Sequence, residues 1–164
     1  MQPQMVMYDE EFQQISAVCE RLAREANAKI VFLVDKNGQL IASVGATQDL
    51  DTTSLASLTA GNIAATGGLA KLIGEKEFSI LFHEGEKDNI HISIVAQRVI
   101  LVVIFDERSS LGLVRLRVRR ATGELDKIFE EITQKVEREK DSLVDFESPF
   151  SEITDDDIDR LFSE

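Results

Sequence analysis

The sequence predicts an α+β fold in the order helix, two strands, helix, three strands, helix, with five antiparallel strands between the helices. Three segments carry apolar residues at helical spacing, and short apolar or alternating runs lie between them. All strand connections except one are short, which indicates antiparallel pairing. The middle helix makes the one long crossover. We therefore expect the outer helices on one sheet face and the middle helix on the other, alone or with a second copy of itself.

An amphipathic helix is predicted for residues 8–26, followed by a β-hairpin. The apolar residues of the helix lie three or four positions apart on one stripe: Phe12, Ile15, Cys19, Leu22 and Ala26. We expect the cysteine of this stripe to be a small buried hydrophobe. The apolar runs 30–34 and 39–44 are predicted strands, because Asn37-Gly38 between them is a strong hairpin signal.

The middle helix, predicted for residues 49–73, carries two different stripes. Capping side chains are available at Asp51, Thr52 and Thr53. One stripe is apolar and comprises Leu55, Leu58, Ala65, Leu69 and Leu72. The other is made of small residues and comprises Ser57, Ala60, Gly61, Ala64, Gly67 and Gly68. Each glycine inside a helix costs about 1 kcal/mol relative to alanine, so the glycines of this stripe need a reason.

Small residues on one stripe let another backbone approach closely. Ala60, Ala64 and Gly68 lie four positions apart and therefore share a face. We expect the apolar stripe to pack on the chain's own sheet, which leaves the small stripe free for a partner; the alternative is that the small stripe itself packs on the sheet. The predicted partner-binding residues of this helix are Ala60, Ala64, Gly67 and Gly68.

Three more strands and a long helix complete the domain. Residues 77–83 form the third predicted strand. In residues 90–95 isoleucines alternate with other side chains, which predicts a strand with one buried face. The run 99–105 is almost continuously apolar and predicts a central strand covered on both faces. The last helix is predicted for residues 110–140, where apolar residues recur at helical spacing.

The composition indicates one globular domain with an acidic tail. The chain has 164 residues, of which 43% are hydrophobic and 29% charged, and its net charge is −12. Residues 141–164 hold −8 of this charge, which leaves −4 for residues 1–140. We therefore divide the chain into a folded domain, 1–140, and an acidic tail, 141–164. The negative charge argues against nonspecific binding to nucleic acid or to anionic membranes.

Cysteine usage and the N-terminal residues predict a cytoplasmic protein. The single cysteine cannot form an internal disulfide, so no secreted disulfide framework is present. No apolar run reaches the roughly 18 residues that a membrane span requires, so we expect no membrane insertion. Residues 1–4 carry neither the basic region nor the cleavage pattern of a signal peptide.

The tail contains the pattern of a short helix. Thr154 is a candidate N-cap, and three aspartates follow in the first turn, where the helix dipole favours negative charge. Ile153 and Ile158 are placed as a hydrophobic staple. We expect a partner-binding helix rather than a disordered solubilising tail, and its predicted anchors are Ile158, Leu161 and Phe162.

No residue pattern predicts a catalytic, cofactor or metal site in the chain itself. The glycines of the middle helix lack the spacing of a phosphate-binding loop or of a dinucleotide-binding motif. His83 and His91 have no carboxylate or cysteine pattern around them, which disfavours metal binding and general-base roles. We favour a solvated face over an arginine finger for the arginines that open the last helix, because a finger usually sits on a mobile loop. These arginines are Arg115, Arg117, Arg119 and Arg120.

Three segments resemble the Roadblock family of dynein-light-chain-like domains: residues 51–74, Phe82-His-Glu-Gly85 and residues 108–115. Within that family the chain is similar to bacterial polarity regulators, from about residue 8 through the tail. The resemblance implies a Roadblock/profilin-like fold and a homodimer in which two sheets join and the middle helices pair. It also implies binding to a Ras-like GTPase and activation of its GTP hydrolysis by reshaping the GTPase, without an inserted arginine finger. It is compatible with concentration at a cell pole.

Two other functions remain open. A scaffold would hold a GTPase or a motor without changing the hydrolysis rate, and sequence cannot separate it from an activator, because rate enhancement depends on geometry in the complex. A ligand-sensing domain is the other, since Roadblock domains are similar in architecture to profilin and PAS-type folds. A sensor needs a pocket with polar groups that orient a ligand, and we find no cluster of such groups in the predicted strands.

Overall fold

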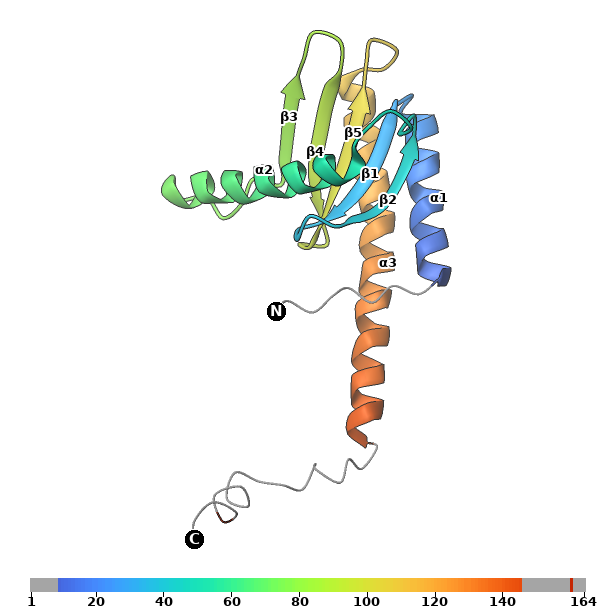
Figure 1. The fold of residues 1–164 in the computed structure, drawn as a ribbon, viewed down its shortest axis with the longest axis vertical. Coiled ribbons are helices and arrows are strands. Elements are labelled where there is room, and N and C mark those ends of the chain that lie inside the picture. The colour runs from blue at the N-terminus through green and yellow to red at the C-terminus, as the bar shows by residue number, and fades with distance from the viewer. Residues whose placement is uncertain (1–8, 146–159, 161–164) are drawn as a thin grey trace.

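The structure is a computed structural model that describes residues 9–145 and residue 160 (Figure 1). Its helices and strands follow one another in the predicted order, which confirms the α+β class. They are α1 (Asp9–Glu25), β1 (Ile30–Asp35), β2 (Leu40–Gly45), α2 (Thr52–Leu72), β3 (Ile80–Glu84), β4 (Asn89–Val95), β5 (Val99–Phe105) and α3 (Leu111–Asp145).

The five strands form one antiparallel sheet in the order β2-β1-β5-β4-β3. Every residue of the central strand β5 is buried, as its continuous apolar run predicts. β1 is also buried along its whole length, and it pairs with both β2 and β5. The two edges are β2 and β3, and α2 connects them across the sheet (Figure 1).

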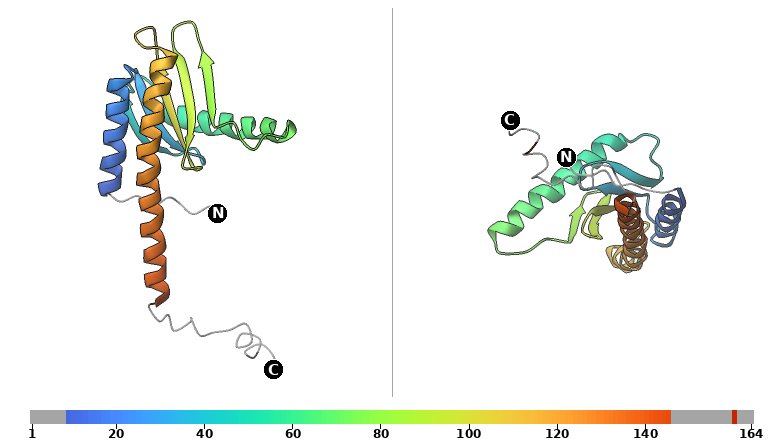
Figure 2. Two further views of the ribbon diagram at one scale, coloured as in Figure 1. Left: turned by 180° about the vertical axis from the view of Figure 1, so that it is seen from behind. Right: turned by 90° about the horizontal axis from the view of Figure 1, so that it is seen from below.

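Helices cover both faces of the sheet. α1 and α3 lie side by side on one face, and α2 crosses the other, as the predicted crossover requires (Figure 2). The core under α1 and α3 includes Ile15 and Leu22 of α1 with Val118 and Leu125 of α3. The core under α2 is smaller; it consists of strand residues together with Ala56 of the helix.

Two tight turns hold neighbouring strands in register. The predicted Asn37-Gly38 turn joins β1 to β2, with Gly38 at φ +90°, a conformation that glycine adopts without strain. The turn between β4 and β5 places Ala96 and Gln97 at φ 53° and 58°, which is uncommon for residues other than glycine. The Asp126 carboxylate of α3 accepts a hydrogen bond from the Ala96 backbone N–H at 2.9 Å and so holds this turn against the helix.

Charged pairs join α1 to α3. The Glu11 carboxylate accepts a hydrogen bond from Lys135, which lowers the pKa of Glu11 and raises that of Lys135. Arg21 and Glu124 form a second ion pair.

The apolar stripe predicted for α1 is wrong at one position, because Phe12 is 44% exposed and Glu11 is buried beside it with 2% exposure.

Two elements differ in extent from the prediction. β3 begins at Ile80 rather than at residue 77. α3 runs from Leu111 to Asp145, past its predicted end at residue 140. None of the helices in the described ranges combines the length and the apolar character needed to cross a membrane.

Candidate functional site

α2 starts at a well-formed N-cap. Asp51 accepts hydrogen bonds from the Ser54 backbone N–H at 3.1 Å and from Ser54 Oγ at 2.6 Å. These bonds lower the pKa of Asp51 and confirm it as the predicted cap. From this point the helix crosses the sheet, and its C-terminal half reaches past the edge strand β3 (Figure 1).

Small and β-branched residues form the sheet-facing side of α2. Ala56 and Thr59 are buried, and Ala60 and Ile63 pack against the strand residues of the core under α2. Small side chains let the helix come close to the strands. The expectation that the small stripe as a whole turns away from the sheet is therefore wrong at Ala60, which packs on the chain's own strands.

The opposite side of α2 exposes large apolar residues. Leu58, Leu69, Leu72 and Ile73 are 72%, 60%, 84% and 67% exposed. The expectation that the apolar stripe packs on the sheet is confirmed at Leu55, which packs against the core under α2. It is wrong at Leu58, Leu69 and Leu72, which are exposed. We call the exposed side the α2 outer surface; it comprises Leu58, Gly61, Ala65, Gly68, Leu69 and Leu72.

The glycines of α2 have free space around them. A Cβ added at Gly61, Gly67 or Gly68 would lie in open space, so packing within this chain does not require glycine there. Ala64 and Gly68 are exposed, and Gly67 is half-buried. A role of these residues in binding a partner stays a prediction. The predicted tail anchors lie outside the described residues: Ile158, Leu161 and Phe162.

His83 holds α2 against the edge of the sheet. The side-chain amide nitrogen of Asn62 lies 3.2 Å from His83 Nε2 in a hydrogen bond. The contact joins the middle of α2 to the edge strand β3. This gives His83 a structural role.

Within residues 9–145 and 160, no three His, Cys, Asp or Glu side chains come together in a way that could hold a metal ion.

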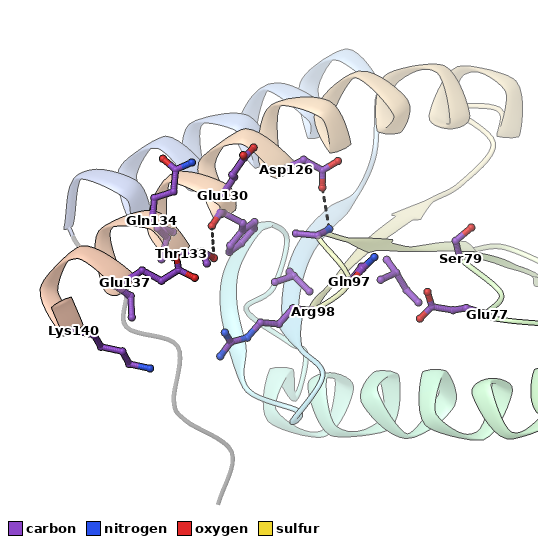
Figure 3. A pocket seen from close by; sticks show the side chains of 16 residues that line it. Glu77, Ser79, Gln97, Arg98, Asp126, Glu130, Thr133, Gln134, Glu137 and Lys140 are labelled. Carbon is purple, nitrogen blue, oxygen red and sulfur yellow. Dashed lines mark hydrogen bonds between the residues drawn. The ribbon is translucent and has the colours of Figure 1, made fainter. Parts of the chain in front are cut away.

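A groove of about 980 Å³ lies between the C-terminal half of α3 and the end of the sheet that carries the turn between β4 and β5 (Figure 3). Its apolar lining residues are Ile94, Val99, Phe129, Ile132 and Val136. Its charged lining residues are Glu77, Arg98, Asp126, Glu130, Glu137 and Lys140. Apolar and charged side chains therefore both line this groove. None of the described residues that we predicted to bind a partner lines this groove.

The arginine cluster lies on α3, on the sheet face opposite α2 (Figure 2). Arg117 and Arg120 are held in ion pairs with glutamates of α1 and α3, at N–O distances of 3.7 and 3.8 Å. Arg115 and Arg119 are exposed. All four side chains therefore project from a helix packed on the sheet, and not from a loop.

Cys19 is completely buried between α1, α3 and the sheet. Burial raises the pKa of its thiol to about 12. A thiol in this state is protonated and unreactive at neutral pH. The prediction of a small buried hydrophobe is confirmed.

Comparisons with known proteins agree with this architecture. The Roadblock/LC7 domain family model matches residues 14–105. A solved structure of Myxococcus xanthus MglB is 69% identical with a TM-score of 0.74, and the match covers 77% of this chain and 96% of that chain. The gliding protein MglB of Thermus thermophilus is 35% identical with a TM-score of 0.74, over 80% of this chain and 99% of that chain.

A further solved structure, described as MglB with a tetrameric arrangement, is 34% identical with a TM-score of 0.74, over 80% of this chain and 99% of that chain. The comparison with curated proteins found no match. The matched domain spans the strands and α2, and the similar structures are covered almost completely. The chain therefore belongs to the Roadblock/LC7 family, among proteins similar to MglB.

Proposed function

We propose that this chain is a homodimeric regulator of the Ras-like GTPase MglA, which accelerates GTP hydrolysis without supplying a catalytic residue or cofactor of its own. The observation that carries the proposal is the α2 outer surface, an exposed apolar face in a chain 69% identical to an MglB protein. Exposed contiguous apolar patches mark protein–protein interaction sites.

The spacing of the α2 outer surface suits contact with another helix. Leu58, Ala65 and Leu72 are seven residues apart, and so are Gly61 and Gly68. Apolar residues repeated at this interval form a seam along a helix, and glycine in the seam permits close approach of a second backbone. The partner that fits best is α2 of a second copy. A similar MglB that is described in a tetrameric arrangement supports self-association.

The position of the arginines supports activation without an arginine finger. They lie on the sheet face opposite α2 (Figure 2), and Arg117 and Arg120 are engaged in ion pairs. A finger must reach the nucleotide of the GTPase and neutralise charge in the transition state. We therefore assign the chemistry to the GTPase's own residues, which this regulator would align.

The acidic tail adds a second contact in this proposal. Residues 141–164 carry a charge of −8 and contain the predicted helix anchors. An apolar helix face that docks in a groove of the GTPase would act as an affinity clamp, because tethering raises its local concentration. The anchors would be Ile158, Leu161 and Phe162.

Single-turnover GTP hydrolysis by MglA, measured with rising concentrations of this protein, tests the proposal. We expect a rate that rises and then saturates. Leu72→Asp places a charge in the α2 outer surface and should abolish dimerisation or GTPase binding. Leu116→Asp is the matched control, because Leu116 is a leucine of α3 that is 58% exposed on the other sheet face. It should leave dimerisation and the stimulated rate unchanged.

Two outcomes would contradict the proposal. If MglA binds at saturation with no change in its hydrolysis rate, the chain is a scaffold, which is the alternative function. If Leu72→Asp dimerises, binds and stimulates like Leu116→Asp, the α2 outer surface is not an interface. Dimerisation is measured separately by sedimentation, so the two failures can be told apart.

A further inference from the structure

A second cavity lies between α3 and the strands β3 and β4, on the sheet face away from α2. Its volume is about 570 Å³. β4 contributes His91 and Ser93 to its lining, and α3 contributes Arg115, Arg119 and Thr122. His91 is 1% exposed and Ser93 is 5% exposed. The prediction that β4 has a single buried face is therefore wrong, because polar side chains are buried under α3 as well.

Polar atoms that line this cavity make no hydrogen bond within the described part of the chain. They are both ring nitrogens of His91, Ser93 Oγ and Thr122 Oγ1. Buried polar groups are nearly always hydrogen-bonded, because an unpaired one loses its contacts with water and gains nothing in exchange. Four such atoms in one cavity call for an explanation, and a ligand that bonds to them supplies one.

The cavity is positively charged in an otherwise acidic protein. Arg115 and Arg119 lie one helical turn apart, and neither makes an ion pair or a hydrogen bond with another described residue, whereas Arg117 and Arg120 are paired. The chain has 30 acidic residues, yet no carboxylate of the described residues lines the cavity. Guanidinium, hydroxyl and ring N–H donors together are the set that holds an oxyanion.

We propose that this cavity binds a small organic oxyanion, a molecule with a phosphate or carboxylate head and an apolar body. Arg115 and Arg119 hold the head in charge-assisted hydrogen bonds, and the hydroxyls of Ser93 and Thr122 with the N–H of His91 complete its coordination. The volume falls in the range of about 300–1,000 Å³ that small-molecule sites occupy. The apolar body lies against Ile80 and Val118.

His91 provides a direct reporter for this site. Its burial and the nearby charge of Arg115 lower the pKa of the ring, which favours the neutral form. The other charged group of the lining is Arg119, and the strand neighbours of His91, Phe82 and Val103, are apolar. A bound anion offsets the arginine charge and stabilises the protonated ring. Binding should therefore raise the pKa of His91, and affinity should increase as the pH falls through the pKa of the bound form.

An NMR titration of the full chain with ring-labelled histidine tests the proposal. The probes are phenyl phosphate and benzoate, which share an aromatic body and differ in the head group, and benzamidine is the cationic control. We expect at least one of the two anions to shift the ring signals of His91 but not those of His83, and benzamidine to shift neither. The tighter anion identifies the head group. Benzoate also serves for the pH series, because its carboxylate stays ionised above about pH 6.

Substitutions in α3 complete the test. Arg115→Gln and Arg119→Gln should each weaken binding of the tighter anion roughly tenfold to hundredfold, the effect of losing a charge-assisted hydrogen bond. Arg120→Gln is the matched control, because Arg120 follows Arg119 on the same helix but does not line the cavity. It should bind like the wild type.

Three results would overturn the proposal. They are the absence of any shift of His91 with both anions, equal binding of benzamidine, and wild-type affinity in both cavity variants. None of these measurements uses GTP hydrolysis, so their failure would leave the proposed regulation of MglA untouched. A failure of GTPase activation would in turn leave this site standing.

Discussion

Replacing Gly61 and Gly68 by alanine is expected to stabilise the protomer and to weaken its self-association. Both glycines lie inside α2, and a Cβ at either position would be in open space within the chain. Alanine is favoured over glycine in a helix by about 1 kcal/mol per site, or about 2 kcal/mol for the double variant. In a domain of this size that gain raises Tm by roughly 4–8 °C.

The same two methyl groups have the opposite effect where a second helix packs closely. If α2 of one protomer meets α2 of its partner at Gly61 and Gly68, each new Cβ forces the helices apart. Overpacking of this kind costs about 1–3 kcal/mol. The dimer dissociation constant should therefore rise by roughly fivefold to 150-fold.

Two measurements separate these effects. Sedimentation equilibrium gives the dimer dissociation constant, and denaturant unfolding at several protein concentrations gives the stability of the protomer, because dimerisation makes apparent stability depend on concentration. Gly123→Ala is the matched control, since Gly123 lies in α3 and its Cβ would also be in open space. It should stabilise the fold and leave dimerisation unchanged. If the double variant behaves like Gly123→Ala in both assays, Gly61 and Gly68 do not lie at a close helix contact and the reasoning fails.

Four further predictions concern other parts of the molecule. Lys135→Met removes the partner of Glu11, whose lowered pKa contributes stability above the unfolded pKa of about 4.3 and loses it as the pH falls through the folded value. The variant should therefore have a lower Tm than the wild type near pH 7 and a smaller deficit near pH 3, and an equal deficit at both would contradict the pairing. Cys19 should react with a disulfide reagent near pH 8 only as fast as the chain opens, whereas the rate of a free thiol would show an accessible site. Deleting residues 148–164 should leave dimerisation and Tm nearly unchanged, lower GTPase affinity and reduce its dependence on salt; unchanged affinity would contradict the clamp. A trans arginine finger contributes about 10³–10⁵ in rate, so any single alanine variant that abolishes stimulation at saturating regulator would overturn the absence of a finger. The alanine variants to compare are those of Arg108, in the loop between β5 and α3, and of Arg115, Arg119 and Arg120 on α3. Each is expected to recover the full rate at saturation.

Local sequence signals were sufficient to predict the strands and their order along the chain. Asn37-Gly38 predicts the first hairpin because both residues tolerate positive φ, and Gly38 adopts it. The continuous apolar run of residues 99–105 predicts a strand covered on both faces, and that strand lies at the centre of the sheet. In both cases the prediction depends only on neighbouring residues, and the same residues form the turn or the buried strand.

The faces of α2 could not be predicted in this way. The helix is apolar or small on all sides, so its hydrophobic pattern does not distinguish the side that packs from the side that is exposed. Leu58 and Leu69 would bury more area than Ala56 and Ala60, but the small residues allow the helix to lie closer to the strands. The choice depends on the distance between two layers, which is a property of the whole fold.

Burial of polar residues was missed for a related reason. Glu11 is buried because Lys135, 124 positions away, reaches it from α3. His91 and Ser93 alternate with isoleucines and so resemble the solvent side of a strand, but α3 covers them. A period of two shows that a strand has two different sides; it does not show whether a helix lies over the second.

The length of α3 has a mechanical consequence for the tail. Among the α3 residues whose side chains the structure describes, Val136 is the last that packs on the core, and the helix continues to Asp145. At 1.5 Å per residue the segment beyond Val136 is roughly 14 Å long. A tilt of about 20° in a helical segment of that length moves its end by about 5 Å. The number of helical residues beyond Val136 therefore sets the distance from the folded body at which residues 146–164 are attached.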